Sequence, residues 1–418
     1  MIMTEWKTYT LKELSKGRGE YGIGAPAVPF DKEKYTYLRI TDINDDGTLN
    51  TSGMMSVDAD DAEEYILEKN DIVFARTGNS TGRSYFYDGR DGELVYAGFL
   101  IRFRLDETKV NPKILKYYTH SKPYYDWVKS FDTGGTRGNI NAKTYGDMPI
   151  YLPPRHIQDR IAGILGAIDD KIENNRRINT NLELQAQALY KQWFVDFEFP
   201  NEDGKPYKSS GGKMIDSELG PIPEGWRVQT ISDISVRIAS GGTPKSLNES
   251  YYNGEIKWFT TKELKDCFLI DSDKHISTEA LNDSAAKLFP KNTILMAIYA
   301  APTVGRLGIL TAESTFNQAA VGIVAKEEIG HLFVYLTLLA ERENLNNLAS
   351  GAAQQNLNVG IVKQYKLIVP TKKLLIEFNQ IAGSLFERIK VVSNENKTLA
   401  TLRDTLLPKL MNGEIKTE

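Results

Sequence analysis

One framework occurs twice along this chain of 418 residues. Each copy opens on a Trp-led strand pattern, continues through a Lys-Asn turn, and closes on an Asn-x-Asn block before a short apolar run and Pro. The matched pairs are WKTYTLKEL (6–14) with WRVQTISDI (226–234), KNDIV (69–73) with KNTIL (291–295), GR (82–83) with GR (305–306), and GGTRGNIN (134–141) with GAAQQNLN (351–358). Because the framework is shared and the loop residues differ, the sequence predicts one scaffold used twice to bind two different targets.

The bulk composition places the chain among globular proteins with two domains. Its 418 residues exceed the length that one hydrophobic core usually supports. A content of 41% apolar and 25% charged residues is ordinary for such a protein. The one cysteine, Cys267, excludes an intramolecular disulfide and fits a reducing compartment. Since the sequence shows neither a signal peptide nor an apolar run of about 20 residues, we expect a soluble cytoplasmic protein.

Strand-like and helix-like patterns follow one another in blocks, which predicts an α+β fold. Apolar runs at 35–40, 71–75 and 99–104 are separated by Gly, Asn and Asp turns, and they indicate a twisted sheet accompanied by short helices. A later polar segment rich in Gly, Ser and Pro indicates a linker. The predicted boundaries are 1–154 for the first globular unit, 155–197 for a long helix, 198–221 for the linker, 222–370 for the second unit and 371–418 for a second long helix.

The two long helices carry the pattern of a coiled coil. From Ile161 to Trp193 apolar residues recur at alternating steps of three and four, and a similar seam runs from Leu385 to Leu406. Asn179 and Asn396 occupy equivalent seam positions, where a buried Asn commonly fixes the register. The alternative is two amphipathic helices that each pack on their own unit. The repeated Asn favours an antiparallel coiled coil that separates the two units as a spacer.

Searches for catalytic motifs find none that is complete. The segment GGTPKS (241–246) has Pro244 where a phosphate-binding loop needs glycine. The four histidines have no ligand partner at helical or turn spacing. Glu255-Ile256-Lys257 lacks the upstream acid of a nuclease site, and no methylase motif occurs. The sequence therefore predicts a chain that is not an enzyme and holds no metal or other cofactor.

Binding chemistry remains in the loops, which favours a nucleic acid as the target. The net charge of −4 argues against a uniformly basic DNA coat, but local basic surfaces depend on where the charges lie. Small-residue loops that carry Arg, Asn or Gln suit contacts with phosphates and base edges, although a single loop of this kind is more often a solvated turn. Asn139 and Asn356 belong to the shared framework, where a structural turn role is favoured. The candidate DNA-binding residues are Arg76, Thr77, Asn79, Arg83, Arg137 and Lys143 in the first unit, and Lys245, Tyr299, Arg306, Gln354 and Gln355 in the second.

Taken together, these motifs resemble the specificity subunits of type I restriction–modification systems. The resemblance covers essentially the whole chain and is carried by DSELGPIPEGW (216–226), SGGTP (240–244), YGIGAPA (21–27), LRITDI (38–43) and the two Asn-x-Asn blocks. It implies two target recognition domains that each bind half of a split DNA target, and an antiparallel coiled coil that sets the gap between the halves. It also implies docking of two modification subunits and of restriction subunits. S-adenosylmethionine, ATP and Mg²⁺ would belong to those partners, which methylate adenine at N6 and cleave DNA.

Two other functions remain open at this point. One is a stand-alone DNA-binding regulator whose two domains are joined by a coiled-coil spacer. The other is an interaction scaffold that binds no DNA. A neighbouring gene for an adenine methyltransferase would favour the specificity subunit over both.

Overall fold

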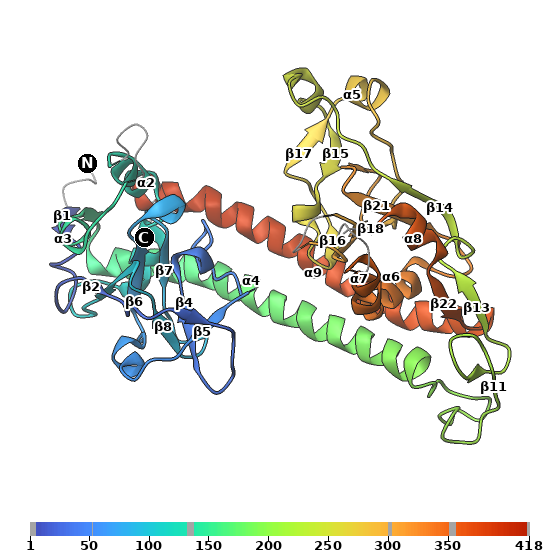
Figure 1. The fold of residues 1–418 in the computed structure, drawn as a ribbon. Coiled ribbons are helices and arrows are strands. Elements are labelled where there is room, and N and C mark those ends of the chain that lie inside the picture. Colours follow the sequence, from blue (N-terminus) through green and yellow to red (C-terminus); the bar gives the residue numbers. More distant parts are fainter. Residues whose placement is uncertain (1–5, 52, 132–137, 300–302, 351–356, 416–418) are drawn as a thin grey trace. The chain divides into compact units, whose positions relative to one another are not determined.

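A computed structural model describes residues 6–51, 53–131, 138–299, 303–350 and 357–415. The chain forms two compact units, which we call unit 1 (Met1–Glu173 with Thr398–Glu418) and unit 2 (Asn174–Lys397). Each unit combines sheet, short helices and parts of two long helices, α4 (Arg155–Tyr190) and α9 (Lys372–Met411) (Figure 1). The predicted α+β class and the two long helices are therefore confirmed. No helix among the described residues has the length and apolar composition needed to cross a membrane.

Unit 1 contains two four-stranded sheets, ordered β2-β9-β6-β7 and β3-β5-β4-β8. The inner strand β6 (Asp71–Ala75) is buried along its whole length, which explains its continuous apolar run in place of an alternating pattern. Phe74 of β6 stacks on Tyr145 with ring centroids 4.7 Å apart, so the sheet is tied to helix α3. The other elements are β2 (Glu20–Tyr21), β3 (Ala27–Val28), β4 (Tyr35–Leu38), β5 (Met55–Val57), β7 (Ser84–Phe86), β8 (Leu94–Tyr96), β9 (Leu100–Arg104), α1 (Pro112–Tyr118), α2 (Lys122–Lys129) and α3 (Ala142–Gly146).

Unit 2 repeats this plan around β18 (Ile294–Ala297), a buried inner strand of the sheet β14-β21-β18-β19-β16. Its three-stranded sheet, β17-β15-β20, matches β5-β4-β8, because in both the middle strand pairs antiparallel on one side and parallel on the other. The other elements are β14 (Ser235–Ser240), β15 (Ile256–Phe259), β16 (Cys267–Leu269), β17 (Lys274–Ile276), β19 (Leu307–Leu310), β20 (Thr315–Phe316), β21 (Ala320–Ala325), α5 (Thr278–Asn282), α6 (His331–Ala340), α7 (Arg342–Ser350) and α8 (Val359–Gln364).

Residues that are repeated in the two copies have the same structural role in both units. Asn70 and Asn292 have φ angles of 73° and 68° in the turns before β6 and β18, a left-handed conformation that Asn tolerates better than most residues. In each unit an antiparallel strand pair leads into the long helix. These pairs are β1 (Lys7–Thr10) with β10 (Pro149–Leu152), and β13 (Arg227–Thr230) with β22 (Lys366–Val369). The internal repeat read from the sequence is thus a repeat of structure.

The helices α4 and α9 pack on each other through a seam that includes buried polar groups. Asn175 is fully buried, and its Nδ2 donates to Asn396 Oδ1 at 2.9 Å and to Glu395 Oε2 at 2.8 Å. Asn179 Nδ2 donates to Ser393 Oγ at 2.9 Å. Because the partner number falls along α9 as the number rises along α4, the helices are antiparallel. Asn179 and Asn396 both lie at the seam, but they do not face each other, and Asn175 is the partner of Asn396.

Residues 198–221, which composition identifies as a linker, are an ordered part of unit 2. Phe199 stacks on Tyr207 and on Trp226, with ring centroids 4.5 Å and 5.2 Å apart. A short hairpin of β11 (Met214–Ile215) and β12 (Ile222–Pro223) follows. The Gly, Ser and Pro residues form the turns of this segment, while aromatic rings hold it in place, so polar composition alone does not reveal its order.

A framework glycine provides a test of the repeat. A Cβ on Gly22 would lie 2.2 Å from the Tyr96 carbonyl oxygen, and a Cβ on Gly241 would lie 2.0 Å from that of Phe316. We expect Gly22→Ala and Gly241→Ala each to lower the free energy of unfolding of their unit by about 2 kcal/mol or more, because the obstructing atoms are backbone. The measurement is thermal unfolding followed by circular dichroism.

The matched control is Gly24→Ala, since a Cβ there meets no atom within 4 Å. Its effect should stay within about 0.5 kcal/mol. Equal destabilisation by Gly22→Ala and Gly24→Ala would contradict the close approach.

Candidate nucleic-acid interface

The loop between β6 and β7 carries the first group of predicted contact residues. It contains one 3-10 turn, Gly78–Ser80, and returns through Gly82, which has a φ of 86°. A Cβ at Gly82 would lie 2.5 Å from Val128 of α2, and a Cβ at Gly305, in the matching loop of unit 2, would lie 2.8 Å from Asn346 of α7. In both units the glycine of the Gly-Arg pair therefore lets the loop backbone lie close to a helix, because glycine has no side chain.

Arg76, at the start of this loop, joins two other segments of unit 1. Its guanidinium lies over the Tyr21 ring, 4.9 Å from the centroid, and its Nε lies 3.4 Å from Asn139 Oδ1. The backbone is fixed as well, because Ile140 N donates to the Arg76 carbonyl at 3.0 Å. Loops that are distant in sequence thus present an Arg, a Tyr and an Asn at one place.

A hollow of about 850 Å³ adjoins this group, and Arg18, Tyr21 and Lys143 are among its lining residues. The acidic residues that line this hollow are neutralised, since Glu20 pairs with Arg102 and Asp147 pairs with Lys12. The hydrogen bond and charge of Lys12 lower the pKa of Asp147. Exposed basic groups therefore dominate here. We call Arg18, Tyr21, Arg76, Asn139 and Lys143 the basic loop cluster.

Two members of the basic loop cluster, Arg18 and Tyr21, were not among the residues predicted from sequence. They reach Arg76 only through the pairing of β2 with β9, which brings Tyr21 beside Ile101. No local motif carries that information. An exposed Tyr next to several Arg and Lys residues is nevertheless typical of nucleic-acid surfaces, and that combination is visible in the sequence.

Arg83 has a different environment from Arg76. Its guanidinium donates to the Ile43 carbonyl at 3.0 Å and pairs with Asp45 at 2.7 Å. Thr77 is half-buried and Asn79 is exposed on the same loop. Both arginines are half-buried, but Arg83 is paired with a carboxylate whereas Arg76 contacts only an aromatic ring and an amide.

The predicted residues of unit 2 are more dispersed. Lys245 is exposed, the Tyr299 side chain is 39% exposed and Arg306 is half-buried. Among the described residues no hydrogen bond or ion pair joins any two of these three. The remaining candidates, Arg137, Gln354 and Gln355, lie outside the described residues.

The turn at Gly241-Gly242 has a structural role. Its geometry as well as its sequence therefore argues against a phosphate-binding loop. A Cβ at Gly242 would lie 2.2 Å from the Ala285 carbonyl, and Trp258 Nε1 donates to the Gly242 carbonyl at 2.9 Å. These glycines allow close backbone packing. The second Asn of each Asn-x-Asn block is likewise structural, because Asn141 accepts from Thr144 N and Asn358 accepts from Ile361 N as helix N-caps.

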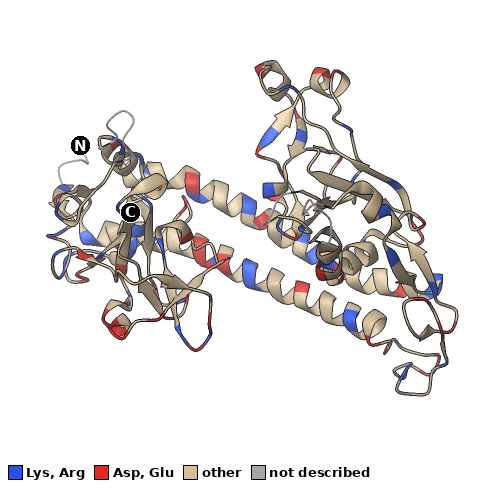
Figure 2. Cartoon of the chain, in the orientation of Figure 1, with Lys and Arg blue, Asp and Glu red and all other residues tan. Residues whose placement is uncertain are grey.

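Within the described part of the chain, no cluster of three or more His, Cys, Asp or Glu side chains could hold a metal ion. Basic and acidic residues are interspersed over each unit (Figure 2). Local clusters and not the net charge therefore define any surface for phosphate.

Comparison with known proteins gives the family. The model of the type I restriction modification DNA specificity domain matches residues 3–184 and again 223–400. The chain belongs to this family. The resemblance inferred from the sequence is thus confirmed, and the two matched segments coincide with the two copies of the repeat.

Two relatives are type I specificity subunits, and one solved structure has the same fold. The chain is 25% identical to the type I restriction enzyme HindI specificity subunit of Haemophilus influenzae, over 99% of this chain and 100% of that protein. It is 28% identical to the MjaIX specificity subunit of Methanocaldococcus jannaschii, over 73% of this chain and 69% of that one. A type I system S subunit from M. genitalium has the same fold, with a TM-score of 0.56 at 17% identity over 97% and 96% of the chains.

The different environments of Arg83 and Lys143 predict different effects on stability. Arg83→Ala removes the hydrogen bond to the Ile43 carbonyl and leaves Asp45 without this cation, so the free energy of unfolding should fall by about 1 kcal/mol. Lys143→Ala, at an exposed site, should change it by less than about 0.5 kcal/mol. Thermal unfolding of the two variants measures both effects. Loss of stability in Lys143→Ala alone would reverse this assignment.

Proposed function

We propose that this protein is the specificity subunit of a type I restriction–modification complex and recognises a split DNA target, one half with each unit. The observation that carries this proposal is the double match to the DNA specificity domain, over segments that fold as two copies of one scaffold. The exposed residues differ between the copies, so each copy would bind a different sequence. A stand-alone regulator is not favoured by these relatives.

The partners follow from the same proposal. Two modification subunits would dock on the chain and methylate adenine at N6 with S-adenosylmethionine, and restriction subunits would add ATP- and Mg²⁺-dependent cleavage. The chain itself would act only in binding, as the lack of a complete catalytic motif suggests. Such a complex would work on DNA in the cytoplasm.

The basic loop cluster supplies the chemistry for one half of the target. Arg can bind guanine at O6 and N7, Asn can bind adenine, and Tyr can stack on a base or contact a phosphate. Arg76 is held in position by the Tyr21 ring and by Asn139, and this placement lowers the conformational entropy that it would lose on contact.

Single substitutions should affect one half of the target only. The protein with a cognate methyltransferase subunit should methylate one split motif, detected by sequencing that reports methyladenine. Arg76→Ala should relax or weaken recognition of one half, at about 1–3 kcal/mol if the contact is a bidentate base contact. Arg306→Ala should do the same at the other half.

Arg83→Ala is the control for general destabilisation, because Arg83 is engaged inside unit 1. If Arg76→Ala weakens both halves equally, Arg76 contacts phosphate or supports folding and the base contact is wrong. If the assembled complex methylates no split motif at all, the proposed function fails.

The paired helices would set the gap between the two halves. The contacts Asn175–Asn396 and Asn179–Ser393 place the Asn181–Leu182 step opposite the Lys390–Val391 step. Seven residues inserted at both steps keep the seam in phase and lengthen the helix pair by about 10 Å, or roughly three base pairs. The variant should methylate the same two half-sites with a longer gap.

An insertion at one step only is the control, since the seam contacts on the two sides of the step can then no longer form together, and this should impair folding or assembly. A doubly lengthened, folded variant that retains the original gap would show that the helices serve assembly alone.

A further inference from the structure

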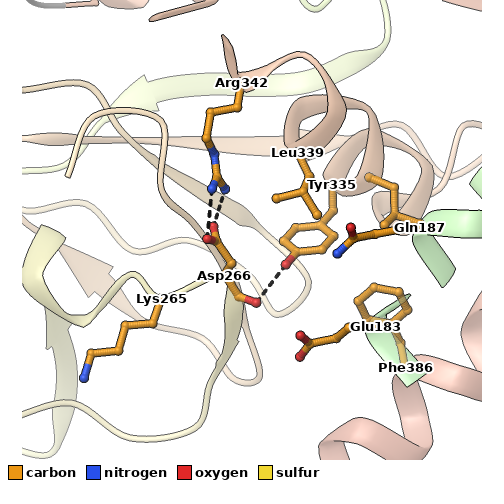
Figure 3. Close-up of a pocket in the computed structure, with 9 residues that line it drawn as sticks. Glu183, Gln187, Lys265, Asp266, Tyr335, Leu339, Arg342 and Phe386 are labelled. Atoms are coloured by element: carbon orange, nitrogen blue, oxygen red, sulfur yellow. Dashed lines mark hydrogen bonds and ion pairs between the residues drawn. The ribbon is translucent and has the colours of Figure 1, made fainter. Parts of the chain in front are cut away.

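Unit 2 contains a pocket of about 400 Å³ that the proposed DNA contacts do not use. It lies where α4, α6, α7 and α9 meet the loop before β16. The rings of Tyr335 and Phe386 form one wall, with centroids 5.6 Å apart in an edge-to-face arrangement. Glu183 and Gln187 of α4 form another wall, and the Glu183 side chain points into the space beside Asp266 and Tyr335 (Figure 3).

The charges in this pocket are incompletely paired. Asp266 forms two bonds with the Arg342 guanidinium, and Tyr335 Oη donates to the Asp266 carbonyl at 3.0 Å. The Lys265 side chain is directed away from Glu183 (Figure 3). Glu183 has no hydrogen bond or ion pair with any described residue, and the undescribed segments of unit 2, 300–302 and 351–356, contain no Lys or Arg. Burial, with a smaller effect of the Asp266 charge, raises the pKa of Glu183 to about 7.

The internal repeat shows what fills the equivalent space in unit 1. There Asp169 of α4 pairs with Lys116 of α1 at 2.6 Å and with Arg403 of α9 at 3.2 Å. Although burial opposes ionisation of Asp169, the charges of Lys116 and Arg403 hold its pKa below the usual value.

In unit 2 an aromatic contact replaces this ionic one. At the helix spacing that relates Asn179 to Asn396, Phe386 replaces Asp169 and Ala186 replaces Arg403. The contact of Tyr335 with Phe386 takes the place of the contact of Lys116 with Asp169. The long cationic side chain that crosses between the helices in unit 1 is therefore missing in unit 2. Glu183 and Gln187, which flank Ala186 on the same turn of α4, line the pocket, so a carboxylate lies one turn from Ala186.

We propose that this pocket binds an organic cation, a guanidinium or primary ammonium group, paired with Glu183 and covered by Tyr335 and Phe386. A carboxylate beside aromatic rings is the combination that recognises such groups by charge-assisted hydrogen bonds and cation–π contacts. A metal ion would need several oxygen ligands, and the described residues hold no such cluster. The cation is either a free small amine or guanidine, or a basic side chain of a partner protein; the second source rests on the proposed function.

The test on the full chain alone uses N-ethylguanidinium as the probe. Methyl NMR signals of Leu336 and Leu339, which line the pocket, should shift and saturate with a dissociation constant on the order of 1–10 mM. Sodium chloride at matched ionic strength should not reproduce the shifts. No saturable shift at these methyls in the wild-type chain would overturn the proposal.

Three variants identify the binding group. Glu183→Gln should weaken probe binding by roughly tenfold or more while the chain stays folded, because the carboxylate it replaces has no partner among the described residues. Glu328→Gln, an exposed acid of the same unit, should bind the probe as the wild type does. Ala186→Arg, which copies Arg403, should fill the pocket and abolish binding. Unchanged affinity in Glu183→Gln would refute the site even if Ala186→Arg does not fold.

A second arm distinguishes the two sources in the complex with the methyltransferase subunit. If a partner side chain is the cation, assembly should block the probe, and Glu183→Gln should weaken assembly. If a free amine is the cation, the complex should still bind the probe and assemble equally well with Glu183→Gln. Because the first arm needs neither DNA nor a partner, its failure leaves the proposed function intact.

Discussion

Leu407 and Leu410, near the end of α9, are buried in the same core as Ile161 and Leu165 of α4. The core of unit 1, formed by the first repeat, is therefore completed by residues from the last turns of the chain. Unit 2 shows the reverse, because Ala186 and Tyr190 of α4 and the aromatic residues that follow this helix are buried with Phe378 of α9. Each unit requires the long helix of the other repeat. Neither core can be complete until the two helices have paired, so this contact of long sequence separation should form late in folding.

The helix seam needs a fixed register because it serves two cores at once. Leucine and isoleucine pack in several registers, whereas a buried amide loses its hydrogen bonds when the register slips. Asn175 meets this need by donating to both Asn396 and Glu395. Position 392 of α9, which the repeat relates to Asn175, holds a valine. On that side of the symmetric pair Asn179 donates to Ser393 instead, so the hydrogen bonds of Asn175 have no exact counterpart.

The same asymmetry appears where each short helix meets the seam. Unit 1 has the ionic group of Asp169, Lys116 and Arg403, and unit 2 has the aromatic pair of Tyr335 and Phe386. An exchange of the helix ends would bury Asp169 without Arg403, which is costly for a charge. These contacts disfavour alternative pairings of similar halves.

Part of the structure could be inferred from the sequence alone. The repeat and the helix seam are periodic patterns, so they could be predicted.

What could not be predicted depends on contacts between distant segments. The repeat singles out Asn179 as the equivalent of Asn396, whereas the partner of Asn396 across the seam is Asn175. Arg18 and Tyr21 join Arg76 only through strand pairing. The order of residues 198–221 comes from aromatic stacking on Trp226. In each case local composition is polar, and the structure follows from a partner far along the chain.

The loops that we propose as DNA contacts have a backbone fixed by residues that the two copies of the scaffold share. Gly82 and Gly305 press each loop against a helix, and Asn141 and Asn358 cap the helix that follows the second loop. These residues fix the backbone at the base of each loop, and Asn79 of the first loop is exposed. Under the proposed function, exchange of an exposed side chain of this kind would change the DNA target without cost to the core. Target and fold would then depend on different atoms of the same loop.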